Sequence, residues 1–300
     1  MADLSYTQAV VIGALQGITE LFPVSSLGHS VLVPALIGGS WAHLVTESSG
    51  ANSEASPYLA FVVALHVATA VALLVFFRRD WSRIITAFLH TLRTRRVRTS
   101  AERLAWLIVV ATIPVGITGL ALEHTFRTVF AKPLFAAFFL TVNGLILLVG
   151  ERLRRGAGSR SSPTRGGLVV AERRQLDTLA YREGVLIGVF QTLALFAGIS
   201  RSGVTMVAGL LRGLDHEDAA KFSFLLATPV ILAAGVLKLP TLAGPAGNGI
   251  QGQVLLGAVV AGVCAYLSVR FLTRYFTTRT LLPFAVYSLG AGVLSIARFA

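Results

Sequence analysis

The sequence has 300 residues, of which 54% are hydrophobic and only 13% are charged. A soluble domain usually has about 25% charged residues, so the composition excludes an ordinary soluble enzyme and indicates a polytopic membrane protein. The net charge of +12 would suggest nucleic-acid binding in a soluble protein. Here the arginines gather in a few loops, which the positive-inside rule explains, and we expect no nucleic-acid partner.

The first half of the chain, residues 1–150, begins with two apolar runs, 7–22 and 24–39, separated at Phe22-Pro23. Each run is too short to cross a bilayer comfortably, because a span needs about 20 residues. Together they predict a re-entrant helical hairpin over residues 7–39. A polar loop at 40–56 follows. Three transmembrane helices are then predicted, at 57–77, 104–122 and 133–150.

Residues 151–180 are rich in arginine, serine and glycine, which predicts a cytoplasmic linker. The second half, residues 181–300, again opens with a short apolar pair, interrupted at Ala197-Gly198. This pair predicts a second re-entrant hairpin over residues 181–214. Three more transmembrane helices are predicted, at 221–239, 252–270 and 281–299.

The two halves match when the chain is shifted by 175 residues. The shift aligns five identical pairs: Ile12 with Ile187, Gly13 with Gly188, Gln16 with Gln191, Ser25 with Ser200, and Gly28 with Gly203. Because each half contains three crossings, the second hairpin must enter the membrane from the opposite side. We therefore expect an all-α fold of two inverted-topology repeats, an architecture that places its site near the bilayer midplane.

Arginine placement predicts the orientation of the chain in the membrane. Eight arginines lie in the 78–103 loop, eight in residues 151–182 and three in residues 270–279, whereas the 40–56 and 240–251 loops have no arginine or lysine. Alternating the spans with 78–103 inside puts every arginine-rich loop in the cytoplasm. The N- and C-termini and the mouth of the first hairpin are then outside. The alternative, in which the short apolar runs are complete spans, breaks this alternation.

The tip of the first hairpin carries the groups that suggest chemistry. Glu20, Ser25, Ser26 and His29 lie within ten residues of one another. Hydrocarbon does not accept such groups without a polar cavity or a partner. His29 follows Ser26 by three residues, and a hydroxyl beside an imidazole suits an activated nucleophile or an acid–base pair. Gln16 precedes Glu20 by four residues and is a candidate to orient it, as is its counterpart Gln191 in the second hairpin.

The tip of the second hairpin adds a positive charge. Arg201 is the one basic residue among 26 that neither a loop nor a span end accounts for. Ser200 begins this arm as Ser25 begins the other, and two helix N-termini at one cavity would form an anion site. Ser202 and Thr205 could add hydroxyl groups to a phosphate site. We expect Arg201 to bind phosphate, because its planar guanidinium fits phosphate oxygens.

Structural alternatives remain open for each of these residues. Ser25 and Ser200 could be helix caps only. Arg201 could simply pair with Glu20, and His29 could be a hydrogen-bonding packing residue. His66, in the middle of a predicted span, has no comparable neighbours in the sequence, and we expect it to be a packing residue.

The two hairpin motifs resemble the undecaprenyl-diphosphatase (bacitracin-resistance) family of bacterial membrane phosphatases. Residues 16–20, read as Gln-Gly-Ile-Thr-Glu, and 23–29, read as Pro-Val-Ser-Ser-Leu-Gly-His, are similar to its first signature. Residues 198–205, read as Gly-Ile-Ser-Arg-Ser-Gly-Val-Thr, are similar to its second. Residues 222–227 also look familial, so the resemblance covers nearly the whole chain.

The resemblance implies hydrolysis of undecaprenyl diphosphate to the monophosphate carrier lipid for cell-wall assembly, with resistance to bacitracin, in the bacterial inner membrane. The partner is then a polyprenyl diphosphate lipid, and bacitracin competes indirectly by binding that substrate. A homodimer is left open. Functional positions of the family match Glu20, Ser26, His29, Ser200, Arg201 and Thr205.

The resemblance also implies a divalent cation, Mg²⁺ or Ca²⁺, and no organic cofactor. Gln16 stands where many members have glutamate, which weakens any metal site with two carboxylates. Glu20 is then the remaining candidate metal ligand in the first hairpin.

We expect Ser26 to attack the terminal phosphorus, with Glu20 or His29 as base; His29 as nucleophile stays open. The main alternative is a transporter or flippase of polyprenyl phosphates, because inverted repeats are a transporter architecture. A transporter needs Arg201 but no nucleophile, so the cluster of Ser26, Glu20 and His29 favours the enzyme.

The predicted orientation can be tested by labelling single cysteines in a Cys264→Ser background. We expect Ser48→Cys to react with an impermeant thiol reagent in intact cells, because it lies in the arginine-free loop. Ser100→Cys should react only after lysis, because it lies in the loop with eight arginines. The reverse pattern would overturn this topology.

Overall fold

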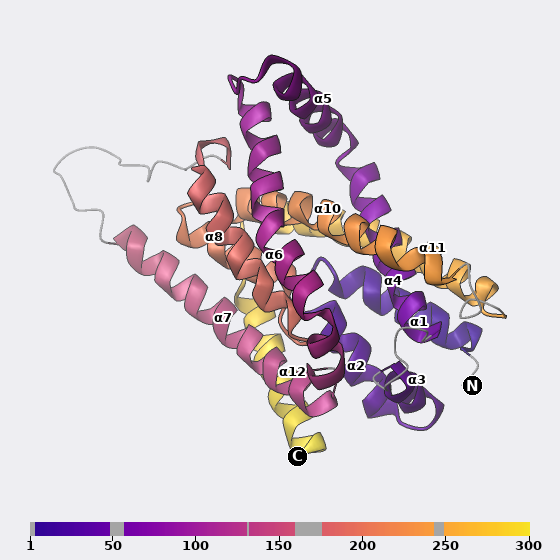
Figure 1. The fold of residues 1–300 in the computed structure, drawn as a ribbon. Coiled ribbons are helices and arrows are strands. Elements are labelled where there is room, and N and C mark those ends of the chain that lie inside the picture. The colour runs from indigo at the N-terminus through magenta and orange to yellow at the C-terminus, as the bar shows by residue number, and fades with distance from the viewer. Residues whose placement is uncertain (1–3, 49–56, 131, 160–175, 243–248) are drawn as a thin grey trace.

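The structure is a computed structural model of the chain and describes residues 4–48, 57–130, 132–159, 176–242 and 249–300. All regular secondary structure in these residues is helical, and they contain no strand (Figure 1). The first half contains α1 (Tyr6–Thr19), α2 (Ser26–Ile37), α3 (Ser40–Ser48), α4 (Pro57–Phe76), α5 (Arg78–Thr94), α6 (Ser100–Phe130) and α7 (Pro133–Ser159). The second half contains α8 (Tyr181–Thr192), α9 (Arg201–Leu211), α10 (His216–Leu242), α11 (Gln251–Tyr275) and α12 (Leu282–Phe299).

The long helices are apolar enough to cross a membrane. Among the described residues, five single helices pass this test by length and composition: parts of α6, α7, α10, α11 and α12. A sixth candidate is the pair formed by α4 and α5, which bends by 87° between Phe76 and Arg78. The six spans expected from the sequence overlap α4, α6, α7, α10, α11 and α12, of which α4 passes the test only together with α5. This confirms an all-α fold with several membrane-spanning helices.

The two segments expected to be hairpins are pairs of short helices. α1 has 14 residues and α2 has 12, whereas α8 has 12 and α9 has 11. At 1.5 Å per residue each is roughly 20 Å long or shorter, less than the hydrocarbon thickness of about 30 Å. The two helices of each pair pack against each other. None of the four can cross the bilayer alone.

Local sequence explains where each pair breaks. Pro23 has no backbone N–H to continue α1, and Ser25 has a positive φ of 71°, which ends any helix. The Ser25 hydroxyl then caps α2 by accepting from Gly28 N (3.2 Å). In the second pair, Gly198 has a φ of 112°, which favours glycine. Ser200 caps α9 in the same way as Ser25 caps α2.

The breaks of the two pairs are joined to each other, although they are far apart in the sequence. Gly198 N donates to the Ser25 hydroxyl at 3.2 Å, and the Ser202 hydroxyl donates to the Phe22 carbonyl at 3.2 Å. The tips of the two hairpins therefore meet inside the bundle, so that the N-termini of α2 and α9 lie close together.

Asn143, in the middle of α7, holds both tips at once. Its side-chain oxygen accepts from Ser200 N (2.9 Å), and its amide nitrogen donates to the Pro23 carbonyl (3.0 Å) and to the Ser288 hydroxyl (3.2 Å). The residue is completely buried. This one amide satisfies backbone groups that the two breaks leave without helical partners.

Two segments expected to be loops contain helices. α3 lies in the expected 40–56 loop, and α5 lies in the arginine-rich 78–103 loop. α5 forms because its apolar residues recur at helical spacing and pack on α6: Phe88 contacts Trp106, with ring centroids 5.2 Å apart, and the Trp106 indole donates to Thr91. In addition, α7 continues to Ser159, so the first part of the expected 151–180 linker is helical.

Replacing Asn143 should destabilise the fold. Asn143→Leu leaves the Ser200 N–H and the Pro23 carbonyl buried without partners, each of which costs about 1–3 kcal/mol. We expect a lower midpoint of thermal unfolding for the detergent-purified variant, with a smaller loss for Ser288→Ala, which removes one contact only. Leu145→Ala, at an exposed position of the same helix, serves as control; an equal effect of all three variants would contradict the bridging role.

Candidate active site

A cavity of about 360 Å³ lies where the two hairpin tips meet α4, α6 and α10. Apolar side chains form most of its wall, among them Val62, Val115 and Ile231. Its polar lining comes from both halves of the chain: Glu20, Ser25, Ser26, His66, Gln191, Ser200 and Arg201. The apolar sequence therefore encloses one concentrated polar site, as expected for a functional cavity within a membrane.

Glu20 is the centre of the polar network. It follows the last residue of α1 and is only 7% exposed. One carboxylate oxygen, Oε1, accepts from Arg201 Nη2 at 2.6 Å. The other, Oε2, accepts from the Ser26 hydroxyl at 2.5 Å and from Gln16 Nε2 at 3.0 Å. These donors stabilise the ionised form of a carboxylate that would otherwise be costly to bury.

Ser26 combines access to the cavity with an acceptor for its proton. It is the first residue of α2, and its hydroxyl donates to Glu20 while lining the cavity. Its side chain is therefore oriented by the carboxylate. A hydroxyl that donates to an adjacent base is the arrangement that activates serine as a nucleophile.

The guanidinium group of Arg201 forms one ion pair and has one nitrogen, Nη1, without a hydrogen-bond partner among the described residues. Nη2 pairs with Glu20, so the structural pairing considered from the sequence is present. Nη1 is buried and has no hydrogen-bond partner among the described residues. Because Arg201 lines the cavity as the first residue of α9, this nitrogen can donate to an anion in the cavity.

Three further expected site residues line the cavity. Ser25 and Ser200 act as helix caps, as the structural alternative stated: their hydroxyl oxygens accept from Gly28 N and Gly203 N. Gln191 donates weakly to the Ala111 carbonyl at 3.5 Å, and its side-chain oxygen has no partner among the described residues. Gln16 lies outside the cavity but contacts Glu20, as its expected orienting role requires.

His29 does not contact Ser26 or Glu20, although helical spacing placed it near Ser26. Its Nδ1 is 2.7 Å from the Ser25 carbonyl oxygen, and its Nε2 is 2.7 Å from the Tyr287 hydroxyl. Its ring also stacks on that of Tyr287, with centroids 5.7 Å apart. Both ring nitrogens therefore already have partners, and His29 is not among the residues that line the cavity.

Ser202 and Thr205 are also turned away from the cavity. The Ser202 hydroxyl donates to the Phe22 carbonyl, and the Thr205 hydroxyl donates to the Arg201 carbonyl at 2.7 Å. Both side chains are about 1% exposed. In this arrangement they stabilise the second hairpin rather than present a hydroxyl to a ligand.

His66 was expected to be a packing residue, but it reaches the site. Its Nδ1 is 2.8 Å from the Val62 carbonyl oxygen, which requires a hydrogen on Nδ1. Its Nε2 is 3.4 Å from Glu20 Oε2, a contact in which a protonated imidazole would form an ion pair with the carboxylate. The signal available in the sequence was an ionisable residue in the middle of a span.

The described residues do not fit a cation held by protein ligands alone. No group of three or more His, Cys, Asp or Glu side chains gathers among them. Glu20 is the one carboxylate in the cavity lining, and both of its oxygens already accept from protein donors. Magnesium and calcium favour several oxygen ligands, which this lining does not supply.

The Glu20–Arg201 pair leads to a prediction about stability. Arg201→Met leaves a buried carboxylate without its main partner, which costs about 3–5 kcal/mol when one member of a buried pair is removed. The double variant Arg201→Met/Glu20→Met should unfold at a higher temperature than either single variant. Lys221→Met, which breaks the more exposed pair with Asp80, should change stability little. A double variant less stable than both single ones would contradict this coupling.

Comparison with known proteins agrees with the resemblance of the motifs. The family model described as "Bacitracin resistance protein BacA" matches residues 9–294. A protein named undecaprenyl-diphosphatase 2 from Frankia alni is 68% identical, over 100% of this chain and 99% of the relative. Proteins named undecaprenyl-diphosphatase from Mycolicibacterium paratuberculosis and Granulibacter bethesdensis are 60% and 46% identical, each over 98% of this chain and 97% of the relative. The chain therefore belongs to the family of the bacitracin resistance protein BacA.

Proposed function

We propose that this protein is a membrane phosphatase that hydrolyses undecaprenyl diphosphate to undecaprenyl phosphate and inorganic phosphate. The observation that carries the proposal is the Ser26 hydroxyl, held 2.5 Å from the Glu20 carboxylate in a cavity beside Arg201. Relatives named undecaprenyl-diphosphatase, 60–68% identical over nearly the whole chain, support the choice of substrate. Such an activity recycles the carrier lipid and confers resistance to bacitracin, which would compete by binding the lipid rather than the protein.

In the first step, Ser26 Oγ attacks the terminal phosphorus of the diphosphate. The hydroxyl proton passes to Glu20 Oε2, the new bond joins Oγ to phosphorus, and the bond to the bridging oxygen breaks. Undecaprenyl phosphate leaves and keeps the bridging oxygen with its electron pair. A water then attacks the phosphoserine, releases inorganic phosphate and restores the Ser26 hydroxyl. Glu20 gives the serine proton to the departing phosphate, then accepts a proton from the attacking water and returns it to Ser26 Oγ, so it ends the cycle as a carboxylate again.

Charge stabilisation would come from Arg201 and the helix ends. Nη1 of Arg201 has no partner among the described residues, so it can donate to a phosphoryl oxygen without breaking a protein contact. α2 and α9 both begin at the cavity, and their N-terminal dipoles favour an anion there. Phosphoryl transfer depends mainly on such positioning and electrostatic stabilisation.

Glu20 is favoured over His29 as the base. A role for His29 as base or nucleophile needs its side chain to leave the Ser25 carbonyl and the Tyr287 hydroxyl, 2.7 Å away each. Glu20 already accepts the Ser26 proton. In this proposal His29 positions the start of α2, and His66 lies beside Glu20, with 3.4 Å between Nε2 and Oε2.

We also propose that the two halves are inverted repeats that place this cavity near the midplane of the bacterial inner membrane. Helix packing supports it: α1 packs on α11 as α8 packs on α6. Gly13 and Gly188, which are 175 residues apart, both allow close approach, since a Cβ would lie 2.5 Å from the Gly257 oxygen and 2.3 Å from the Ala111 oxygen, respectively. The start of α1 and the end of α12 lie on the side of the bundle away from the α5–α6 turn (Figure 1), which supports termini outside the cytoplasm.

A flippase of polyprenyl phosphates is the second candidate function, and the repeat architecture favours it. Transport would use Arg201 and the helix N-termini to bind the headgroup but would not need a nucleophile. The proton-accepting contact between Ser26 and Glu20 favours hydrolysis as the main activity.

The central test of the proposed function is Ser26→Ala. We expect loss of phosphate release from undecaprenyl diphosphate, measured on purified protein in detergent, because no other hydroxyl donates to Glu20 among the described residues. Ser30→Ala is the matched control, one turn further along α2, where the hydroxyl donates to the Ser26 carbonyl. Retention of more than about a tenth of the wild-type rate, a change below about 1.4 kcal/mol, would rule out Ser26 as nucleophile.

We propose that the divalent cation arrives with the diphosphate, because the cavity lacks ligands to hold it beforehand. A chelator should abolish phosphate release. Isothermal titration of the lipid-free protein with Mg²⁺ or Ca²⁺ should show no stoichiometric binding, and Glu20→Gln should give the same titration as the wild type. Tight binding of either ion in the absence of lipid would contradict this arrangement.

A further inference from the structure

A second cavity lies at the C-terminal end of α11 and shares no lining residue with the site described above. It measures about 520 Å³ and is formed by the last turns of α11 and the segment that follows. Three of its lining residues are arginines: Arg270, Arg274 and Arg279. The others are Leu267, Phe271, Tyr275 and Thr278.

Among the described residues, no carboxylate pairs with the arginines of this cavity, Arg270, Arg274 and Arg279. All three residues are exposed. Three like charges around one concave surface repel one another and attract an anion.

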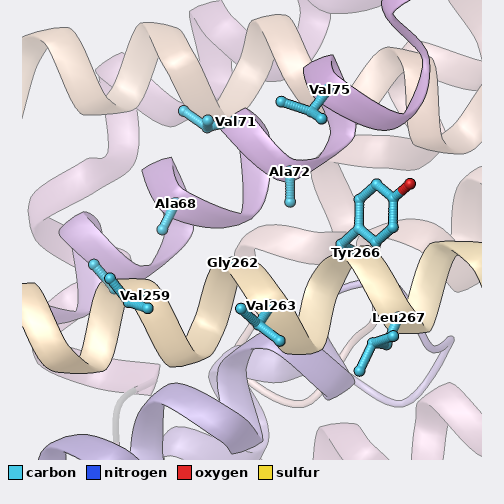
Figure 2. A pocket seen from close by; sticks show the side chains of 10 residues that line it. Ala68, Val71, Ala72, Val75, Val259, Gly262, Val263, Tyr266 and Leu267 are labelled. Atoms are coloured by element: carbon cyan, nitrogen blue, oxygen red, sulfur yellow. The ribbon is translucent and has the colours of Figure 1, made fainter.

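An apolar groove lies next to this cavity. It measures about 500 Å³ and lies between α4 and α11 (Figure 2). Its walls are aliphatic except for Tyr266, and they include Ala68, Val71, Val259 and Val263. Leu267 lines both the groove and the arginine cavity, so the two are adjacent.

The sequence of α11 builds this combination on one helix face. Val259, Val263, Leu267, Arg270 and Arg274 follow one another at intervals of three or four residues, which keeps them on one side of a helix. The apolar part comes first and the arginines occupy the final turns. A cation near a helix C-terminus is also favoured by the helix dipole.

We propose that this surface is a binding site for one anionic phospholipid. The headgroup phosphate binds Arg270, Arg274 and Arg279, and one acyl chain lies in the groove between α4 and α11. A soluble anion would not use the groove, and a zwitterionic lipid would not offset the uncompensated charge. Basic pockets at the ends of membrane helices bind acidic lipid headgroups in this way. The site is separate from the catalytic cavity and does not depend on the proposed hydrolysis.

The test is native mass spectrometry of the full-length protein, titrated with phosphatidylglycerol or phosphatidylcholine in detergent. We expect one phosphatidylglycerol to bind well before any phosphatidylcholine. The double variant Arg270→Gln/Arg274→Gln should bind it roughly 30-fold more weakly, since each basic residue contributes about a fivefold gain near an acidic lipid. Arg93→Gln/Arg96→Gln removes the same charge from exposed positions outside the cavity and should bind like the wild type.

A second pair of variants tests the groove without changing charge. Val263→Trp should fill it and weaken phosphatidylglycerol binding, whereas Leu255→Trp, on the same helix at a position 68% exposed and outside the groove, should not. Equal binding by the arginine double variant and its control, or unchanged binding by Val263→Trp, would overturn the proposal. Stronger binding of undecaprenyl phosphate than of phosphatidylglycerol would overturn it as well, because the occupant would then be a prenyl lipid.

Discussion

The buried ion pair between Glu20 and Arg201 is the interaction on which the rest of the site depends. Each group alone would be expensive to hold in apolar surroundings, and the two come from opposite halves of the chain, 181 residues apart. Their pairing at 2.6 Å therefore fixes one hairpin against the other. The same carboxylate accepts from the Ser26 hydroxyl, so assembly of the fold and orientation of this hydroxyl depend on one another.

Much of this arrangement could be predicted from local sequence. Pro23 and Gly198 mark the breaks, Ser25 and Ser200 are recognisable caps, and the lengths of the flanking helices follow from the apolar runs. The pairing of Arg201 with Glu20 was one of two stated alternatives, because a lone cation in an apolar helix needs an anion. These features depend on properties of a few neighbouring residues, which is why the sequence carries them.

The remaining features depend on contacts between distant elements, which spacing within one helix cannot predict. Asn143 bridges both tips from α7, a helix in which the sequence suggested no site residue. His29 turns to Tyr287, 258 residues away, whereas His66 takes the position beside Glu20. α5 was treated as a loop because its arginines dominate its composition, although its apolar residues have helical spacing and pack on α6.

The hydrogen bonds that join the hairpin tips also limit how the protein can move. Gly198 with Ser25, Ser202 with Phe22, and Asn143 with Ser200 connect the two halves of the chain through buried groups. Pulling the halves apart would expose these backbone groups to hydrocarbon, at several kcal/mol for each group left unpaired. Rocking of one half against the other, the usual motion of repeat-based carriers, would thus meet a steep barrier. The fold therefore holds its two halves together at the cavity and does not let them slide past each other.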